Sequence, residues 1–323
     1  IMKLGVLTVL LGDLSLEKTL EYLKSLGVQQ VEVGCGGYPG TAHADARKFL
    51  DNPKLIDDFV ATIEKSGIEV AAFACHGNPL HPNKEIARDY HEQFKAAILL
   101  AEKVGVKTIV GFSGCPGDSE TSQYPNWVVA TWPEDFQTIK EWQWKEKLVP
   151  YWKDMSEFAN NHGVTQIALE LHPGFCVYNP ETLLRLREAV GPTIGANFDP
   201  SHLFWQGIDP VIAIRALKGT IYHFHAKDTA IDSYNTAVNG VLSTTKFDDI
   251  SNRSWVFRTV GYGHGEDVWR SIFSELRKNG YDGCISIEHE DGLMTSKEGL
   301  EKAVELLKRT IIFDSQQVTM YWA

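Results

Sequence analysis

Short apolar segments alternate with amphipathic helical patterns along the whole of this 323-residue chain. Helical patterns such as 15–27 and 84–105 end at a glycine that directly precedes the next apolar segment, and Ser15 is a suitable N-cap for the first of them. The alternation predicts eight β/α units, because each apolar segment has the length of a buried strand. These segments are residues 4–10, 28–34, 68–75, 106–112, 164–171, 193–199, 220–226 and 283–289.

Eight such units predict an α/β fold, a parallel (β/α)8 TIM barrel formed by one domain over residues 1–313, with a C-terminal tail at 314–323. An open doubly wound sheet is the alternative, but no GxGxxG follows the first strand. In a barrel, sites form where the strands end. The connections 113–137 and 228–264, after strands four and seven, are long and are predicted to be lids or partner surfaces.

Large apolar and polar side chains alternate in the last four predicted strands, so that each strand presents two different faces. The apolar face carries Ile167, Leu169 and Leu171, then Ala196 and Phe198, then Tyr222 and Phe224, then Ile285 and Ile287. The opposite face carries Ala168 and Glu170, then Asn197 and Asp199, then His223 and His225, then Ser286 and Glu288. Acidic or imidazole side chains therefore converge at one end of the barrel.

Three of these converging groups, Glu170, Asp199 and Glu288, are carboxylates, and they cannot crowd together as anions without protons or a cation to neutralise them. Three oxygen ligands and the imidazole of His225 suit one divalent ion. Mn²⁺ is the first choice, with Co²⁺, Mg²⁺ or Zn²⁺ as alternatives. This interpretation excludes a lysine or arginine head group from the space among the four side chains.

The strand ends carry five motifs, namely ACHGNPL (74–80), ALELHP (168–173), NFDPSHLFW (197–205), HFHAKD (223–228) and ISIEHED (285–291). Together they resemble the motifs of the sugar isomerase and epimerase superfamily, which has a xylose isomerase-like barrel and includes inosose-processing enzymes. The resemblance implies that Glu170, Asp199, His225 and Glu288 bind one divalent ion. It also implies that His202, the histidine of DxxH, reaches the substrate beside the metal.

Glu170 and Glu288 are the predicted catalytic residues. On opposite sides of a keto sugar, one carboxylate would remove the proton next to the carbonyl and the other would return a proton, while the metal polarises the oxygen. The residues predicted to bind the hydroxyl or phosphate groups of the substrate are His76, His172, His202 and Arg258.

The predicted function is therefore metal-dependent isomerisation or epimerisation of a keto sugar, sugar phosphate or inosose. Elimination from a 3-keto glycoside, by a lyase or deglycosidase that works with a second subunit, is the alternative. The long loops and the nine tryptophans suit a bulky aglycone or a subunit interface. We expect a homo-oligomer, with a hetero-oligomer as the alternative.

The composition excludes some classes of binding partner and indicates a cellular compartment. The net charge is −11, with 42 acidic against 31 basic residues, which argues against nucleic acid as a partner. The sequence has no apolar run of the length that spans a membrane. Five single cysteines without a CxxC pair indicate reduced thiols, and hence a cytoplasmic protein.

Overall fold

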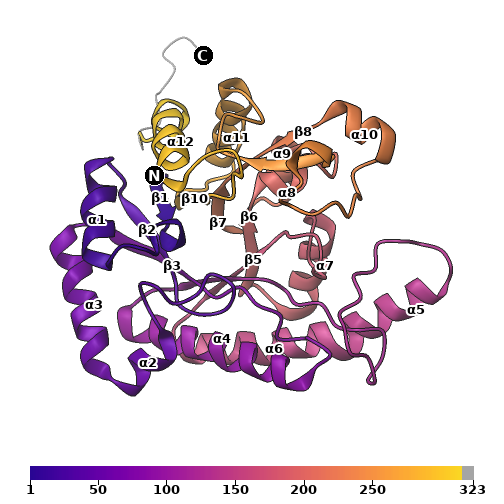
Figure 1. The fold of residues 1–323 in the computed structure, drawn as a ribbon. Coiled ribbons are helices and arrows are strands. Elements are labelled where there is room, and N and C mark those ends of the chain that lie inside the picture. Colours follow the sequence, from indigo (N-terminus) through magenta and orange to yellow (C-terminus); the bar gives the residue numbers. More distant parts are fainter. Residues whose placement is uncertain (315–323) are drawn as a thin grey trace, which may run out of the picture.

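The computed structural model describes residues 1–314, and its strands form the predicted closed barrel (Figure 1). Eight parallel strands follow one another around the barrel in the order β1-β10-β7-β6-β5-β4-β3-β2, so that the last barrel strand pairs with the first. The predicted tail at 314–323 lies, apart from Asp314, outside the described residues. The barrel strands are β1 Lys3–Leu7, β2 Gln30–Gly34, β3 Glu69–Ala74, β4 Thr108–Gly111, β5 Gln166–Glu170, β6 Ile194–Phe198, β7 Ile221–Ala226 and β10 Cys284–Ile287.

Helices cover the outside of the barrel (Figure 1). The sequence signals at their ends act as predicted: the Ser15 side chain accepts a hydrogen bond from the Lys18 amide, and Gly67 and Gly105 end their helices in the left-handed conformation. The helices are α1 Leu16–Ser25, α2 Ala46–Asp51, α3 Pro53–Ser66, α4 Lys84–Val104, α5 Asp135–Trp142, α6 Val149–Asn161, α7 Pro180–Val190, α8 Pro200–Phe204, α9 Pro210–Ala216, α10 Ser233–Asn239, α11 Glu266–Lys278 and α12 Ser296–Thr310.

The two long connections, after β4 and after β7, both contain secondary structure. The connection after β4 has no helix until α5, which continues through the π-helical turn Gln143–Leu148 into α6. The connection after β7 contains the antiparallel pair β8 Asp228–Ile231 and β9 Trp255–Arg258, with α10 between them. Short 3-10 helices occupy Thr8–Leu11 and Ile250–Asn252, so the first predicted strand ends earlier than its apolar run.

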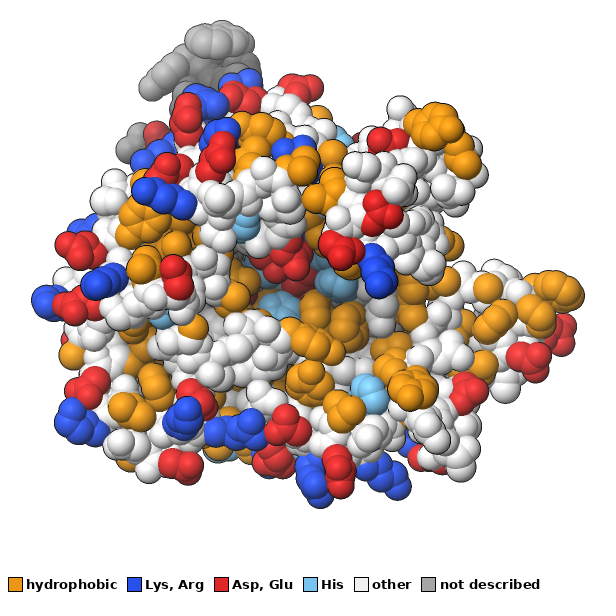
Figure 2. Space-filling model, in the orientation of Figure 1, with side chains coloured by type: hydrophobic (Ala, Val, Ile, Leu, Met, Phe, Trp, Pro, Cys, Tyr) orange, Lys and Arg blue, Asp and Glu red, His pale blue; other side chains and the backbone are white. Residues whose placement is uncertain are grey.

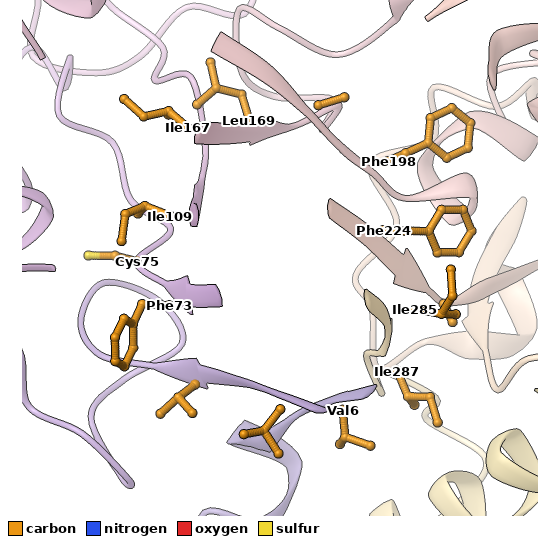
Figure 3. Close-up of a cluster of buried hydrophobic side chains, with 14 of the residues drawn as sticks. Val6, Phe73, Cys75, Ile109, Ile167, Leu169, Phe198, Phe224, Ile285 and Ile287 are labelled. Carbon is orange, nitrogen blue, oxygen red and sulfur yellow. The ribbon is translucent and has the colours of Figure 1, made fainter. Parts of the chain in front are cut away.

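The barrel wall separates two different kinds of packing. Large apolar side chains point outward into the layer between strands and helices, among them Phe73, Phe198, Phe224 and Ile285 (Figure 3). Inside, the apolar cluster consists only of Ala72, Val110 and Ala168, with Tyr222 packed against it. The small interior side chains leave room for polar groups above them.

Tyr222 corrects one detail of the predicted alternation. It was expected on the outer face with Phe224, yet its ring packs against the interior cluster and would collide with a side chain at Gly195. The cause is an irregularity in the pairing of β6 and β7, where the register shifts between Ala196 and Asn197. Beyond that shift, His223 and His225 have the predicted orientation.

Within the described residues, the helices are all too short or too polar to cross a membrane.

Candidate metal centre and active site

A cavity of about 250 Å³ opens at the ends of the barrel strands, and Figure 2 shows acidic and histidine side chains gathered in this hollow. One wall is largely apolar and the other is charged, as expected of a small-molecule site. The apolar wall contains Leu7, Val9, Leu10, Tyr38, Pro39 and Phe112. The polar wall contains His76, Glu170, His172, Lys227, Glu288, His289, Glu290 and Ser296.

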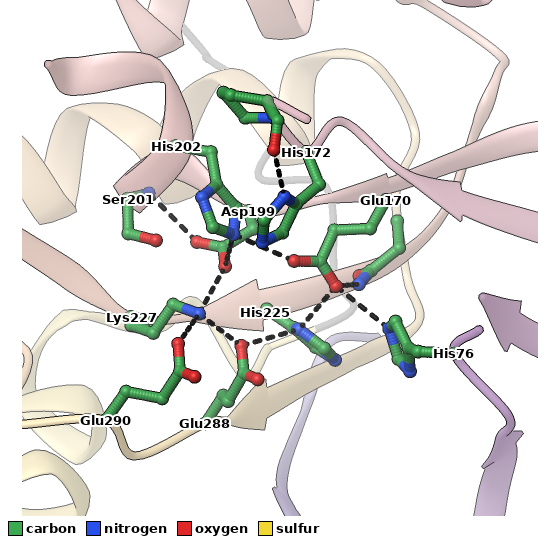
Figure 4. A network of polar contacts seen from close by, with 12 residues as sticks. His76, Glu170, His172, Asp199, Ser201, His202, His225, Lys227, Glu288 and Glu290 are labelled. Atoms are coloured by element: carbon green, nitrogen blue, oxygen red, sulfur yellow. Dashed lines mark hydrogen bonds and ion pairs between the residues drawn. The ribbon is translucent and has the colours of Figure 1, made fainter. Parts of the chain in front are cut away.

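Glu170 is the last residue of β5 and is only 2% exposed. Its Oε1 lies 2.9 Å from Nε2 of His202, while its Oε2 lies 3.0 Å from Nε2 of His76 and accepts a hydrogen bond from the Asn197 amide at 3.1 Å (Figure 4). Burial raises the pKa of this carboxyl, but the hydrogen bonds from His202 and His76 outweigh burial and leave the pKa well below its usual range. Glu170 is therefore an anion with an unusually dense set of donors.

Asp199 follows β6 directly and caps the short helix α8, where its Oδ1 accepts a hydrogen bond from the Ser201 amide at 2.9 Å. The cap fixes the carboxylate so that Oδ2 lies toward the other acids, without a hydrogen-bond partner. Burial raises the pKa of Asp199 to about 7, even though Lys227 lies nearby. His202 stands one helical turn later, with Nε2 3.3 Å from Oδ2 of Asp199.

His225 on β7 and Glu288 directly after β10 complete the predicted ligand set. Nδ1 of His225 lies 3.1 Å from Oε2 of Glu288 and 3.4 Å from Oε2 of Glu170. Burial raises the pKa of Glu288, but the charges of Lys227 and His225 lower it to about 2. One ligand atom from each of Glu170, Asp199, His225 and Glu288 lies within 4.8 Å of the others.

Lys227, directly after β7, is a residue that the sequence interpretation excluded from this place. Its ammonium lies 3.2 Å from Oδ2 of Asp199, 2.7 Å from Oε2 of Glu288 and 2.6 Å from Oε2 of Glu290. The expectation that no lysine or arginine head group lies in the space among the four side chains is wrong on the side of Asp199 and Glu288, because the crowded carboxylates attract any cation that the chain can supply. Lys227 approaches from the side of Asp199 and Glu288, away from Glu170 (Figure 4).

The donor set nevertheless fits a divalent cation. One ammonium is set against three carboxylates, and burial makes the remaining negative charge costly. Two of the four candidate ligand atoms, Oδ2 of Asp199 and Nδ1 of His225, are buried and form no hydrogen bond, only ion-pair contacts at 3.1 to 3.4 Å. Three oxygens and one imidazole nitrogen are ligands that Mn²⁺, Co²⁺ and Zn²⁺ accept.

The structure brings three of the four predicted substrate-binding residues to this centre. His76 and His172 line the cavity, and His202 lies behind them with its ring 4.0 Å from that of His172. Burial lowers the pKa of His202 to about 3, so this ring is neutral. Arg258 lies elsewhere: on β9, its guanidinium pairs with Asp291 at 3.0 Å and does not line the cavity.

Glu32 on β2 was missed by the sequence analysis. This carboxylate is fully buried, and its Oε2 lies 2.9 Å from Nε2 of both His223 and His225. It also accepts a hydrogen bond from Ser286 at 2.8 Å. The signal was present in VQQVEVG, where Glu32 stands near the end of an apolar strand in the same way as Glu170.

Residues 20–310 match the family model of the xylose isomerase-like TIM barrel. The chain belongs to this family, as its motifs and its closed barrel indicate. It is 39% identical to the uncharacterized protein YfiH of Bacillus subtilis over 312 residues, which cover 96% of this chain and 99% of that protein.

Two further comparisons concern an enzyme and a structure with a bound metal. An inosose dehydratase of Clostridium tetani is 27% identical over 146 residues, which are 43% of this chain and 47% of the relative. The crystal structure of the IOLI protein with a bound zinc atom superposes with a TM-score of 0.64 at 21% identity, covering 96% of each chain. The superposition with the IOLI structure shows that the two proteins share a fold.

Proposed function

We propose that this protein is a divalent-metal-dependent isomerase or epimerase of a keto sugar, sugar phosphate or inosose. The observation that carries the proposal is the convergence of Glu170, Asp199, His225 and Glu288 within 4.8 Å of one another, beside a small cavity that the two glutamates line. The IOLI structure has the same fold and contains a bound zinc atom, which supports a metal ion in a barrel of this kind. We expect Mn²⁺ as the ion in solution.

The chain's own residues would handle the proton. A cation held by the four ligands would supply positive charge to the oxygen of a bound ketone, which acidifies the neighbouring C–H group. Glu170 and Glu288 both line the cavity. One carboxylate takes the proton from the α-carbon, and the other returns a proton to the opposite face or to the adjacent carbon.

The neighbouring residues orient these two acids. His76, His202 and Asn197 fix Glu170 through hydrogen bonds on both of its oxygens. Glu288 has greater freedom, because its side chain is 19% exposed to the cavity. The apolar wall, with Tyr38 and Phe112, excludes water from the opposite side and offers rings for a sugar to stack on.

Incubation with a panel of keto sugars and inososes in D₂O with Mn²⁺ tests the proposal. We expect one substrate to take up deuterium next to its carbonyl while its carbon skeleton stays intact. Glu170→Gln and Glu288→Gln should each lower the rate of this exchange by about 10²–10⁴-fold while the sugar still binds. Wild-type exchange in both variants would exclude the two glutamates as the proton-transfer pair.

Elimination is the second candidate, and two observations favour it. A relative of this chain is an inosose dehydratase, and Lys227 with Glu290 lies beside Glu288 at the cavity wall. After loss of the α-proton, the C–O bond at the β-carbon would break and the departing oxygen would take a proton from the Lys227 ammonium. Formation of the unsaturated ketone, or release of an aglycone, in the D₂O experiment would identify this reaction.

A further inference from the structure

The buried carboxylate of Glu32 lies below the candidate metal centre, inside the barrel. Its Oε2 is the shared acceptor for His223, His225 and Ser286, which come from β7 and β10 on neighbouring positions of the barrel wall. Burying a carboxylate completely is costly unless several donors compensate it. A side chain whose only task was to fill space here would be apolar, like Ala72 and Val110 nearby.

The imidazole of His225 connects the two centres. Its Nε2 is 2.9 Å from Glu32, while its Nδ1 is 3.1 Å from Glu288 and 3.4 Å from Glu170. A carboxylate can only accept, so Nε2 must carry the proton in this contact. Nδ1 faces the carboxylates of Glu288 and Glu170, so a cation bound among them would take the place of a proton on Nδ1 and meet the lone pair of the neutral ring.

We propose that Glu32 is a positioning residue of the metal centre, which holds His225 as an Nδ1 ligand and increases its affinity for a divalent cation. This inference rests on the proposed function for the presence of the cation. A ligand histidine commonly donates its second N–H to a carboxylate, which fixes the ring and makes it a better donor to the metal. His223 bonds to the same oxygen but is not in the four-ligand set.

Glu32→Gln tests the charge of this residue while keeping its shape. Oε1 of Glu32 has no hydrogen-bond partner, so an amide NH₂ at that position displaces no donor, and the amide oxygen can replace Oε2. We expect Glu32→Gln to bind Mn²⁺ about 10-fold to 100-fold more weakly than the wild type in calorimetric titration.

Ser286→Ala is the matched control, because it removes one hydrogen bond from the same Glu32 oxygen and none of the four ligands. Its Mn²⁺ affinity should stay within about 3-fold of the wild type. A merely structural role for Glu32 would lower the melting temperature of both variants and leave both affinities unchanged, and this result would overturn the proposal. Absence of Mn²⁺ binding by the wild type would instead overturn the proposed function.

A second measurement needs no variant. In ¹⁵N-histidine-labelled wild-type protein loaded with Zn²⁺, the long-range ¹H–¹⁵N couplings of each ring report which nitrogen carries the proton. We expect His225 to keep its proton on Nε2 while the Nδ1 resonance shifts on Zn²⁺ binding. A proton on Nδ1 with Zn²⁺ at Nε2 would show that Glu32 does not orient this ligand.

Discussion

The two sides of the barrel wall differ in what fills them. Outside, Phe73, Phe198 and Phe224 are fully buried in a continuous apolar layer beneath the helices. Inside, three small apolar side chains form the floor, and buried acids and histidines occupy the space above it. Burying ionisable groups costs free energy, whereas burying large apolar groups gains it. The outer layer therefore stabilises the fold. The buried ionisable groups inside the barrel lower the free energy of unfolding, but they form the candidate active site.

The largest effect should follow a change of one cavity-lining acid. Glu288→Gln keeps the shape of the side chain but removes a base and a metal ligand, so kcat for the proton exchange should fall by about 10²–10⁴-fold. Glu275→Gln is the matched control, since Glu275 is also a glutamate of low exposure, 3% against 19% for Glu288, but pairs with Arg215 on the helical layer. A comparable loss in both variants, measured at saturating ketone and Mn²⁺, would contradict the division between the two sides of the wall.

Truncation in the outer layer should affect stability alone. Phe224→Ala leaves a cavity between β7 and the helices, and should lower the free energy of unfolding by about 3–5 kcal/mol in urea titration. Its neighbour His225 points to the opposite side of the same strand. The folded variant should therefore bind Mn²⁺ within about 3-fold of the wild type. A large loss of affinity would show that the outer packing also shapes the centre.

The cation should contribute to stability only through the interior. At a free Mn²⁺ concentration of 100 times Kd, the free energy of unfolding of the wild type should rise by about 2.7 kcal/mol. Asp199→Asn keeps the oxygen that caps α8 but loses the negative charge of Oδ2. This variant should show little or no rise with Mn²⁺. An equal rise in both proteins would place the ion elsewhere.

The smallest change in stability should follow a larger side chain in the interior apolar cluster of Ala72, Val110 and Ala168. Ala168→Leu adds volume where Val110, Ala72 and Tyr222 already meet, so we expect a loss of about 1–3 kcal/mol in the free energy of unfolding. The same measurement in urea would detect it. A stabilised variant would mean that the floor holds empty space, and that small side chains there are not required by packing.

The sequence predicted features that are local to one strand better than features that depend on a neighbouring strand. The alternation of apolar and polar side chains correctly predicted the barrel and the inward direction of Glu170, His223 and His225, because the side-chain period of a strand is a local property. Tyr222 departs from it, since the register shift beside it depends on the neighbouring strand. Arg258 was expected at the site, but its partner Asp291 is 33 positions away in the chain.

Side-chain contacts between strands that are far apart in the chain could not be predicted from the spacing of residues in the sequence. Glu32 and His223 are 191 positions apart, and their hydrogen bond exists only because the barrel closes. Lys227 follows its strand in a motif that the resemblance already contained, yet nothing local shows that its ammonium turns toward Asp199 and Glu288. Pairings of this kind follow from the three-dimensional arrangement of strand ends.

The central claim is that one divalent cation binds among Glu170, Asp199, His225 and Glu288. Anomalous X-ray scattering from crystals soaked in Mn²⁺ tests it most directly. We predict a single strong peak in the cavity, within about 2.0–2.6 Å of a donor atom from each of the four side chains. A map without this peak, with the Lys227 ammonium still seated against Asp199 and Glu288, would contradict the account.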